Sequence, residues 1–129
     1  MPKTVAELVA DAMAQVEDVA PKEAAVEVAA GGAVFLDVRE PVEWEHHIGG
    51  AVQVPRGILE FVADPTSPKH HPQLDPASRV IVYCRSGHRA ALAGVTLKDM
   101  GFANVANLTG GITAWQEAGL PVAEHHDGL

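Results

Sequence analysis

The chain contains one cysteine, Cys84, in the segment VYCRSGHRAA at residues 82–91. Two arginines, Arg85 and Arg89, stand close to it, and Gly87 lies between them. The thiolate form of a cysteine is the nucleophile, and nearby cations and backbone N–H groups favour the thiolate over the thiol. The types and spacing of these residues therefore predict an activated cysteine that attacks or binds a small anionic substrate.

The elements around this cysteine must form the anion site. Residues 79–83, RVIVY, are β-branched and apolar, which predicts a buried strand, and residues 89–100 predict a helix that ends at Gly101. The loop between them then lies before a helix N-terminus, where inward backbone N–H groups and the helix dipole bind anions. Gly87 permits a positive φ in this turn. The predicted substrate-binding residues are Arg85, Ser86, Gly87, His88 and Arg89.

Two simpler interpretations of these residues stay open. A lone cysteine at the end of a strand is often only a small buried hydrophobe. His88 is a possible general base for Cys84, but such a pair needs a third group that holds the histidine in place. No third group is evident in the sequence, so we expect His88 to contribute its backbone N–H and a solvated ring.

Further strands and helices are expected on both sides of this unit. Apolar side chains at helical spacing predict a helix at residues 5–17, and Thr4 with Glu7 forms a capping-box pattern at its start. Other predicted helices lie at residues 22–30, 57–63 and within 109–119, and other predicted strands at 33–38, 51–55 and 104–108. This order predicts an α/β fold with a central, mainly parallel sheet of about five strands, flanked by helices on both faces and extended by the N-terminal helix. The ligand is then expected at the carboxyl ends of the strands.

The histidines offer little evidence of a metal site. His70 and His71 lie in a long loop with four prolines at residues 64–78, and one hypothesis is that this loop folds over the pocket and restricts acceptors. Paired ligands on a helix prefer a spacing of four residues. The histidines here are adjacent, as in His46-His47 and His125-His126, so we predict neither a metal nor another cofactor.

Length and composition set the class of protein. The 129 residues, 47% of them hydrophobic, suit one domain. We expect a helical extension at residues 1–18, the main domain at 19–122 and a frayed tail at 123–129. No apolar run reaches the ~20 residues of a membrane span, and the N-terminus lacks the apolar core of a signal peptide. With one cysteine and no internal disulfide, these features predict a cytoplasmic protein that binds no membrane.

The formal net charge of −8 disfavours nucleic acid as a partner, because no basic stripe offsets it. The local cluster of arginines favours a small anion instead. The sequence does not determine the oligomeric state. The N-terminal helix suits packing on the sheet, a dimer interface or a binding site for a partner protein equally well.

Three segments together carry a resemblance to a known family. DVREPVEWEHHIGGAVQVP, VYCRSGHRAALA and NLTGGITAWQEAGLPV resemble the motifs of single-domain rhodaneses, which are sulfurtransferases, and the match runs from about residue 21 to residue 122. The resemblance implies that Cys84 takes a sulfane sulfur from a small anionic donor such as thiosulfate and becomes a persulfide. Cyanide, a small thiol or a partner protein would then accept the sulfur.

The resemblance also suggests parts for residues outside the loop. Asp37 and Arg39 match the strand-end pair of the family, where charge pairing is expected to shape the pocket floor. His47 matches a turn before the next strand, where a positioning hydrogen bond is expected rather than a catalytic function. Because the sequence has no second cysteine, a Cys84 persulfide cannot be resolved as an internal disulfide, so the acceptor must be external.

Two alternative functions follow from related proteins. Cysteine phosphatases that resemble rhodaneses have one more residue between the cysteine and the arginine, whereas here Arg89 closes a six-residue loop and position 90 is alanine. Phosphatase or arsenate reductase activity therefore ranks below sulfur transfer. Some rhodanese-like domains are binding or regulatory modules without catalysis, but these usually lack the cysteine that is present here.

Overall fold

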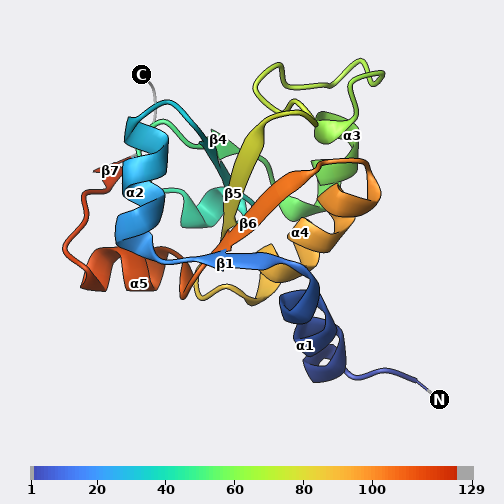
Figure 1. The fold of residues 1–129 in the computed structure, drawn as a ribbon, viewed down its shortest axis with the longest axis horizontal. Helices are drawn as coiled ribbons and strands as arrows, with labels where there is room; N and C mark the ends of the chain where they lie inside the picture. The colour runs from blue at the N-terminus through green and yellow to red at the C-terminus, as the bar shows by residue number, and fades with distance from the viewer. Residues whose placement is uncertain (1, 125–129) are drawn as a thin grey trace.

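A five-stranded parallel β-sheet lies between two layers of helices in the computed structural model, which describes residues 2–124 (Figure 1). The strand order β1-β6-β5-β2-β4 puts β5, which carries Cys84 at its end, in the middle of the sheet. All pairings in this sheet are parallel, so the carboxyl ends of the strands share one edge. The predicted α/β fold is confirmed. The strands are β1 (Glu17–Val19), β2 (Val34–Asp37), β4 (Val52–Gln53), β5 (Arg79–Tyr83) and β6 (Asn104–Leu108).

The helices cover both faces of the sheet and divide the core into two clusters. They are α1 (Val5–Gln15), α2 (Pro21–Ala29), α3 (Leu59–Ala63), α4 (His88–Asp99) and α5 (Gly111–Glu117), with short 3-10 turns η1 (Pro41–Glu43) and η2 (Arg56–Ile58). Successive side chains of a strand point to opposite faces. Val80 and Val82 therefore pack with α3 and α4, whereas Ile81 and Tyr83 pack with α2 and α5. None of the helices within residues 2–124 is long and apolar enough to cross a membrane.

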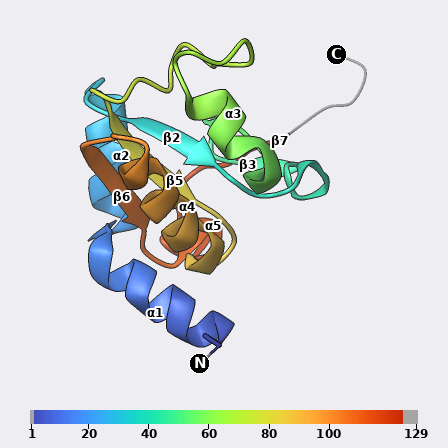
Figure 2. The ribbon, with the colours of Figure 1, turned by 90° about the vertical axis from the view of Figure 1, so that its right-hand side faces the viewer.

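The N-terminal helix α1 packs beside α4 and not on the sheet (Figures 1 and 2). Its predicted capping box is present, since Thr4 Oγ1 accepts a hydrogen bond from the Glu7 N–H at 3.1 Å and Glu7 Oε1 accepts one from the Thr4 N–H at 3.2 Å. The helix ends at Gln15, two residues earlier than predicted. Close packing at its end depends on Gly94 in α4, where an added Cβ would lie 3.1 Å from the methyl groups of Val16.

Three short strands, β1, β3 and β7, lie where the sequence predicted none. β1 pairs with β6 through residues 17–19, so the predicted domain boundary at residue 18 runs through a strand of the main sheet. β7 (Ala123–Glu124) pairs with β3 (His46–His47) in a two-stranded antiparallel sheet, where a turn and a frayed tail were expected. The rest of the predicted tail, including His125 and His126, lies outside the described residues.

The proline-rich loop at residues 64–78 lies at the opposite end of the sheet from Cys84 (Figure 1). It enters the amino end of β5, whereas Cys84 follows the carboxyl end of that strand. The loop is packed in place, because Leu74 is fully buried and the His71 N–H donates to the Val62 carbonyl at 3.0 Å. The hypothesis that this loop covers the cysteine is therefore wrong.

Arg79 ties the amino end of the sheet together. Its guanidinium donates to Glu17 at 2.9 Å, to Glu27 at 2.9 Å and to the Asn104 side chain at 2.8 Å, and so joins β1, α2, β5 and β6. The hydrogen bonds to Glu17 and Glu27 raise the pKa of Arg79 above its ordinary value. This part of the fold is remote from Cys84, so its stability can be changed without touching the site.

We expect Arg79→Met to lower the free energy of unfolding by about 2 kcal/mol, because it removes several charge-assisted hydrogen bonds at once. Urea denaturation of the wild-type and variant proteins measures this difference. Lys69→Met, at an exposed position in the proline-rich loop, is the control for loss of a positive charge and should change the free energy little. Equal stability of the Arg79 and Lys69 variants would contradict the prediction.

Candidate functional site

Cys84 follows β5 and is almost completely enclosed, with 1% of its surface exposed. Cys84 is two residues after Val82 and four after Val80, so its side chain points to the same face of the sheet, the one covered by α4. Its Sγ accepts hydrogen bonds from the N–H groups of Gly87 at 3.1 Å and Ala90 at 3.4 Å. Backbone N–H groups that converge on a sulfur stabilise negative charge on it.

The first turn of α5 binds the outer side of the cysteine loop. The Ile112 N–H donates to the carbonyl of Cys84 at 2.9 Å, and the Thr113 N–H donates to the carbonyl of Arg85 at 3.1 Å. A Cβ on Gly111 would lie 2.5 Å from both of these carbonyl oxygens, so a glycine is needed for this close approach. Because α5 binds these two carbonyls, they face away from the sulfur.

Gly87 and Asn107 hold the other end of the loop. Gly87 has a φ of 111°, in the left-handed region that a glycine adopts without strain, and it caps the start of α4. Its carbonyl accepts hydrogen bonds from the Asn107 side chain at 3.0 Å and from the Ala91 N–H at 3.0 Å. Asn107 stands on β6 with 2% of its surface exposed, so the strand beside β5 positions the residue whose N–H reaches Cys84. The sequence analysis did not identify Asn107.

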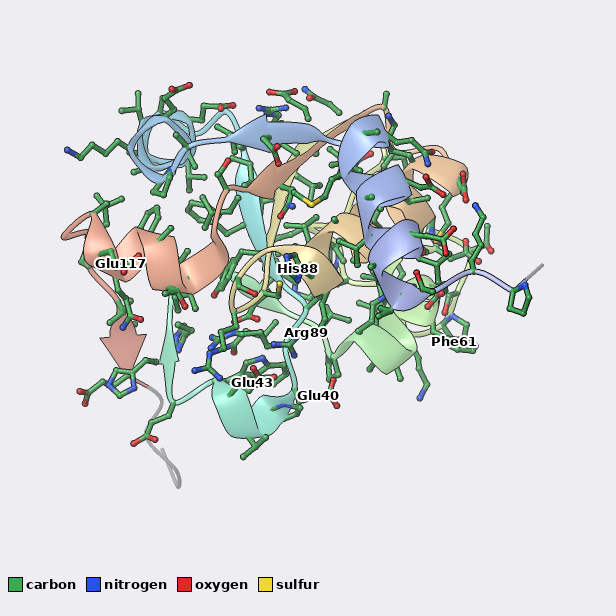
Figure 3. The ribbon with its side chains drawn as sticks, turned by 90° about the horizontal axis from the view of Figure 1, so that it is seen from below. Glu40, Glu43, Phe61, His88, Arg89 and Glu117 are labelled. Carbon is green, nitrogen blue, oxygen red and sulfur yellow. The ribbon has the colours of Figure 1, made fainter. Side chains whose placement is uncertain are left out.

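Arg89 is bound to an acidic residue that the sequence analysis also missed. Its two terminal nitrogens donate to the two carboxylate oxygens of Glu43 at 2.7 and 2.9 Å, and Figure 3 shows the two side chains together. Hydrogen bonding to Arg89 lowers the pKa of Glu43 to about 2, and the same pair raises the pKa of Arg89. The positive charge of Arg89 is thus partly neutralised by the protein itself. The two residues are 46 positions apart, so their spacing in the sequence does not predict that they form an ion pair.

Asp37 and Arg39 form a buried pair under the segment that carries Glu43. Arg39 donates to Asp37 through Nε at 3.0 Å and Nη2 at 2.8 Å. It also donates to the backbone carbonyls of Glu43 and His46, each at 2.8 Å. The ring of Tyr83 lies 5.6 Å below its guanidinium, and burial raises the pKa of the Tyr83 hydroxyl. Arg39 therefore positions the backbone of Glu43. The Glu43 side chain in turn holds the Arg89 guanidinium.

The other predicted loop residues face solvent. Arg85, Ser86 and His88 are exposed, and within residues 2–124 the Arg85 guanidinium makes no hydrogen bond or ion pair. Within residues 2–124, the guanidinium of Arg85 is therefore unpaired, whereas that of Arg89 is paired with Glu43. Among the described residues, the Cys84 sulfur has backbone partners only, and no hydrogen bond joins it to the His88 ring.

His47 and His70 each have a local partner. The Nδ1 atom of His47 lies 3.0 Å from the carbonyl of Trp44, which is a local positioning contact of the kind expected. His70 Nε2 lies 2.8 Å from the Leu74 carbonyl in the proline-rich loop. Over the described part of the chain, no three His, Cys, Asp or Glu side chains gather in a way that could hold a metal ion.

A comparison with known protein families shows which family this chain belongs to. The model of the rhodanese-like domain matches residues 20–118, which is most of the chain. The chain belongs to the rhodanese family. This confirms the resemblance carried by the three sequence segments.

Named relatives of this rhodanese-like protein include sulfurtransferases. The probable adenylyltransferase/sulfurtransferase MoeZ of Mycobacterium tuberculosis is 35% identical over 82 residues, which are 63% of this chain. The chain spans only 19% of MoeZ. Thiosulfate sulfurtransferase 16, chloroplastic, of Arabidopsis thaliana is 37% identical over 95 residues, which cover 67% of this chain and 77% of the relative.

A solved structure matches nearly the whole chain. It is a protein of unknown function from Rhodopseudomonas palustris, described as a possible tyrosine phosphatase. It is 34% identical with a TM-score of 0.84, and the match covers 95% of this chain and 99% of the other. The match includes the region of α1 and β1, which precedes the residues 20–118 that the family model matches.

We expect Asn107→Leu to slow alkylation of Cys84 by about tenfold, because the Gly87 N–H then no longer lies in position to donate to the sulfur. The leucine keeps the approximate size of the side chain but removes the donor to the Gly87 carbonyl. The rate of reaction with iodoacetamide measures the effect on Cys84, and urea denaturation reports any loss of stability separately. Unchanged alkylation in a folded variant would show that Asn107 does not position the loop.

We expect Glu43→Gln to lower the free energy of unfolding by about 1 kcal/mol near neutral pH, because it breaks an ion pair that water partly screens. The pKa of Glu43 is about 2 in the folded protein and 4.5 in the reference state, so the pair stabilises fully above 4.5. This contribution is lost as the pH falls toward 2.

Urea denaturation of both proteins at about pH 7 and about pH 3 tests this dependence. The difference between wild type and Glu43→Gln should shrink at the lower pH. Glu117→Gln, on α5 away from the loop, is the matched control (Figure 3). A difference that stays constant over this range would mean that the Arg89 pair does not lower the pKa of Glu43.

Proposed function

We propose that this protein is a sulfurtransferase that moves a sulfane sulfur from an anionic donor such as thiosulfate to a thiophilic acceptor. A persulfide on Cys84 carries the sulfur between the two steps. The observation that carries the proposal is the convergence of the Gly87 and Ala90 N–H groups on the sulfur of an enclosed cysteine. Membership of the rhodanese family and relatives named as sulfurtransferases support it.

In the loading step, the Cys84 thiolate attacks the outer sulfur of thiosulfate. A bond forms between the two sulfurs, the sulfur–sulfur bond of thiosulfate breaks, and sulfite leaves with the electron pair. The free guanidinium of Arg85 attracts the dianion to the loop of an otherwise acidic protein. The loop amides stabilise the negative charge on the attacking sulfur and later on the persulfide.

In the discharge step, an external acceptor attacks the outer sulfur of the Cys84 persulfide. The bond to Sγ breaks, and its electron pair returns to Sγ as a thiolate that the Gly87 and Ala90 amides bind again. The sequence holds no second cysteine that could intercept the persulfide as a disulfide. The cycle therefore has two half-reactions with a covalent intermediate, which gives ping-pong kinetics.

Phosphate ester hydrolysis is the second candidate, because the similar Rhodopseudomonas palustris protein is described as a possible tyrosine phosphatase. The loop amides argue against it here. They lie 3.1 and 3.4 Å from Sγ itself, so they enclose a sulfur atom, and Arg89 is paired with Glu43 and does not extend toward a phosphate. We infer that hydrolysis of a phosphate ester is at most a minor activity.

We expect the intact mass of the protein to rise by one sulfur atom after incubation with thiosulfate and to return to its original value after cyanide is added. Cys84→Ser, which removes the nucleophile and keeps the size of the side chain, should show no gain. Electrospray mass spectrometry of the intact protein measures both steps, and thiocyanate release provides an independent readout of the discharge.

The same preparation should be assayed with para-nitrophenyl phosphate. Release of nitrophenol that depends on Cys84, together with no gain of sulfur from thiosulfate or from a persulfide donor, would overturn the proposal in favour of phosphatase activity. If neither sulfur gain nor hydrolysis occurs, the chain is a binding module, and the proposed cycle is wrong.

A further inference from the structure

The ion pair between Arg89 and Glu43 lies close to the reactive sulfur. Arg89 stands in the first turn of α4, where the Ala90 N–H donates to Cys84 Sγ at 3.4 Å. The hydrogen bond to Glu43 raises the pKa of Arg89 most, and the charge of Cys84 raises it further, so the guanidinium is near enough to interact with that charge. Figure 3 shows the Arg89 and Glu43 side chains together, close to His88 of the cysteine loop. The sulfur-transfer cycle described above gives this ion pair no function.

The Glu43 carboxylate is held in place by its own segment of the chain. Its Oε1 atom accepts a hydrogen bond from the Glu40 N–H at 3.0 Å, across the turn η1. The backbone carbonyl of Glu43 accepts another from the buried Arg39 guanidinium at 2.8 Å. The carboxylate is therefore a fixed group at the site, and its position does not depend on Arg89 alone.

This carboxylate occupies the two Arg89 nitrogens that an oxyanion would bind. The terminal nitrogens of Arg89 donate to the two carboxylate oxygens at 2.7 and 2.9 Å. A guanidinium binds carboxylates and other oxyanions in this same two-pronged way. The sulfonate group of thiosulfate offers oxygens of the same kind. Thiosulfate must therefore compete for Arg89 with Glu43, which is part of the chain and is always present.

The other groups of the loop can balance only one negative charge of a donor. The Gly87 and Ala90 N–H groups already bind Cys84 Sγ. Within residues 2–124, Arg85 is the arginine whose guanidinium is unpaired. One positive charge balances a singly charged donor, whereas a dianion brings a second charge that has no counterpart in the loop. The formal net charge of −8 adds to the repulsion of that second charge.

We propose that Glu43 is a specificity-determining residue that favours singly charged sulfur donors over dianionic thiosulfate. It does so by keeping Arg89 occupied, so that only the Arg85 guanidinium meets the donor. The favoured donor is an anion whose transferable sulfur carries the only negative charge, as in an organic persulfide or a thiosulfonate. This inference rests on the proposed sulfur-transfer function and specifies the charge of the donor for it.

Thiosulfate and methanethiosulfonate are a matched pair of donors that differ in this charge. Methanethiosulfonate has a methyl group where thiosulfate has a charged oxygen. With either donor, the Cys84 thiolate attacks the outer sulfur, the sulfur–sulfur bond breaks, and the electron pair leaves on sulfite or on methanesulfinate. Both reactions form the same Cys84 persulfide and need no oxidant or reductant. The leaving groups are the same for wild type and variants, so a change in the ratio of the two rates reports on recognition of the donor charge.

The test measures kcat/KM for each donor with cyanide in excess as the acceptor. For Glu43→Gln we expect the ratio of kcat/KM for thiosulfate to kcat/KM for methanethiosulfonate to rise about fivefold, mainly through KM for thiosulfate. The reason is that the released Arg89 guanidinium gains a charge-assisted contact with the dianion. Glu43→Asp keeps the charge but shortens the side chain, so it should give a smaller rise.

Glu45→Gln is the matched control for the loss of a nearby negative charge. Glu45 is exposed and lies two residues from Glu43, and within residues 2–124 the ion pair of Arg89 is with Glu43 and not with Glu45. We expect Glu45→Gln to change the donor ratio by less than about twofold, because water and salt screen an exposed charge. Urea denaturation shows whether each variant is folded under the assay conditions, and Glu43→Asp supplies the test if Glu43→Gln does not fold.

The outcomes separate this inference from the proposed function. If wild type loads sulfur that cyanide removes but the Glu43 variants have the wild-type donor ratio, the specificity function of Glu43 is wrong while the sulfurtransferase function stands. The same conclusion follows if Glu45→Gln raises the ratio as much as Glu43→Gln, or if folded Glu43→Gln loads from neither donor. If neither donor loads the wild-type protein with sulfur that cyanide removes, the proposed function fails, and the specificity function fails with it.

Discussion

The site depends on one arrangement of peptide groups: the carbonyls of the cysteine loop are bound from outside, and the N–H groups face the sulfur. The N–H groups of Ile112 and Thr113 bind the carbonyls of Cys84 and Arg85, and Asn107 binds the carbonyl of Gly87. The N–H of Gly87 is then free to meet Sγ at 3.1 Å. Every unpaired polar backbone group in a buried turn is costly, so these outer bonds stabilise the fold while they shape the cradle.

The arginines of the site have different functions because the tertiary structure gives them different partners. Arg39 is buried with Asp37 and bonds to the backbone around Glu43, and Glu43 in turn holds Arg89. This chain of contacts fixes the wall of the site and reduces its net positive charge. Among the arginines, only Arg85 keeps an unpaired guanidinium within residues 2–124.

Alternation along β5 explains why the cysteine is enclosed on the α4 face of the sheet. Val80, Val82 and Cys84 share the face covered by α4, so the sulfur lies directly under the first turn of that helix. Ile81 and Tyr83 face α5, and the Tyr83 ring supports Arg39 on that side. The middle position of β5 in the sheet gives the loop neighbours on both sides, from β6 and from β2. The site thus uses contacts that the core requires in any case.

The sequence by itself determined the elements whose signals are local. The apolar run of β5, the cap of α1 at Thr4 and the glycine-containing turn after Cys84 follow from nearest neighbours, and they predicted the α/β fold and the position of the cysteine. β1 was missed because two of its three residues are charged, and it is a strand only through its pairing with β6.

Only the tertiary structure decided which distant groups meet. Glu43 binds Arg89 across 46 positions, and Asn107 binds Gly87 across 20. It also placed the proline-rich loop at the end of the sheet away from Cys84. The physical reason is that hydrogen bonds and ion pairs form between groups that the packing of the sheet brings together. The spacing of residues along the chain does not show which groups that packing will bring together.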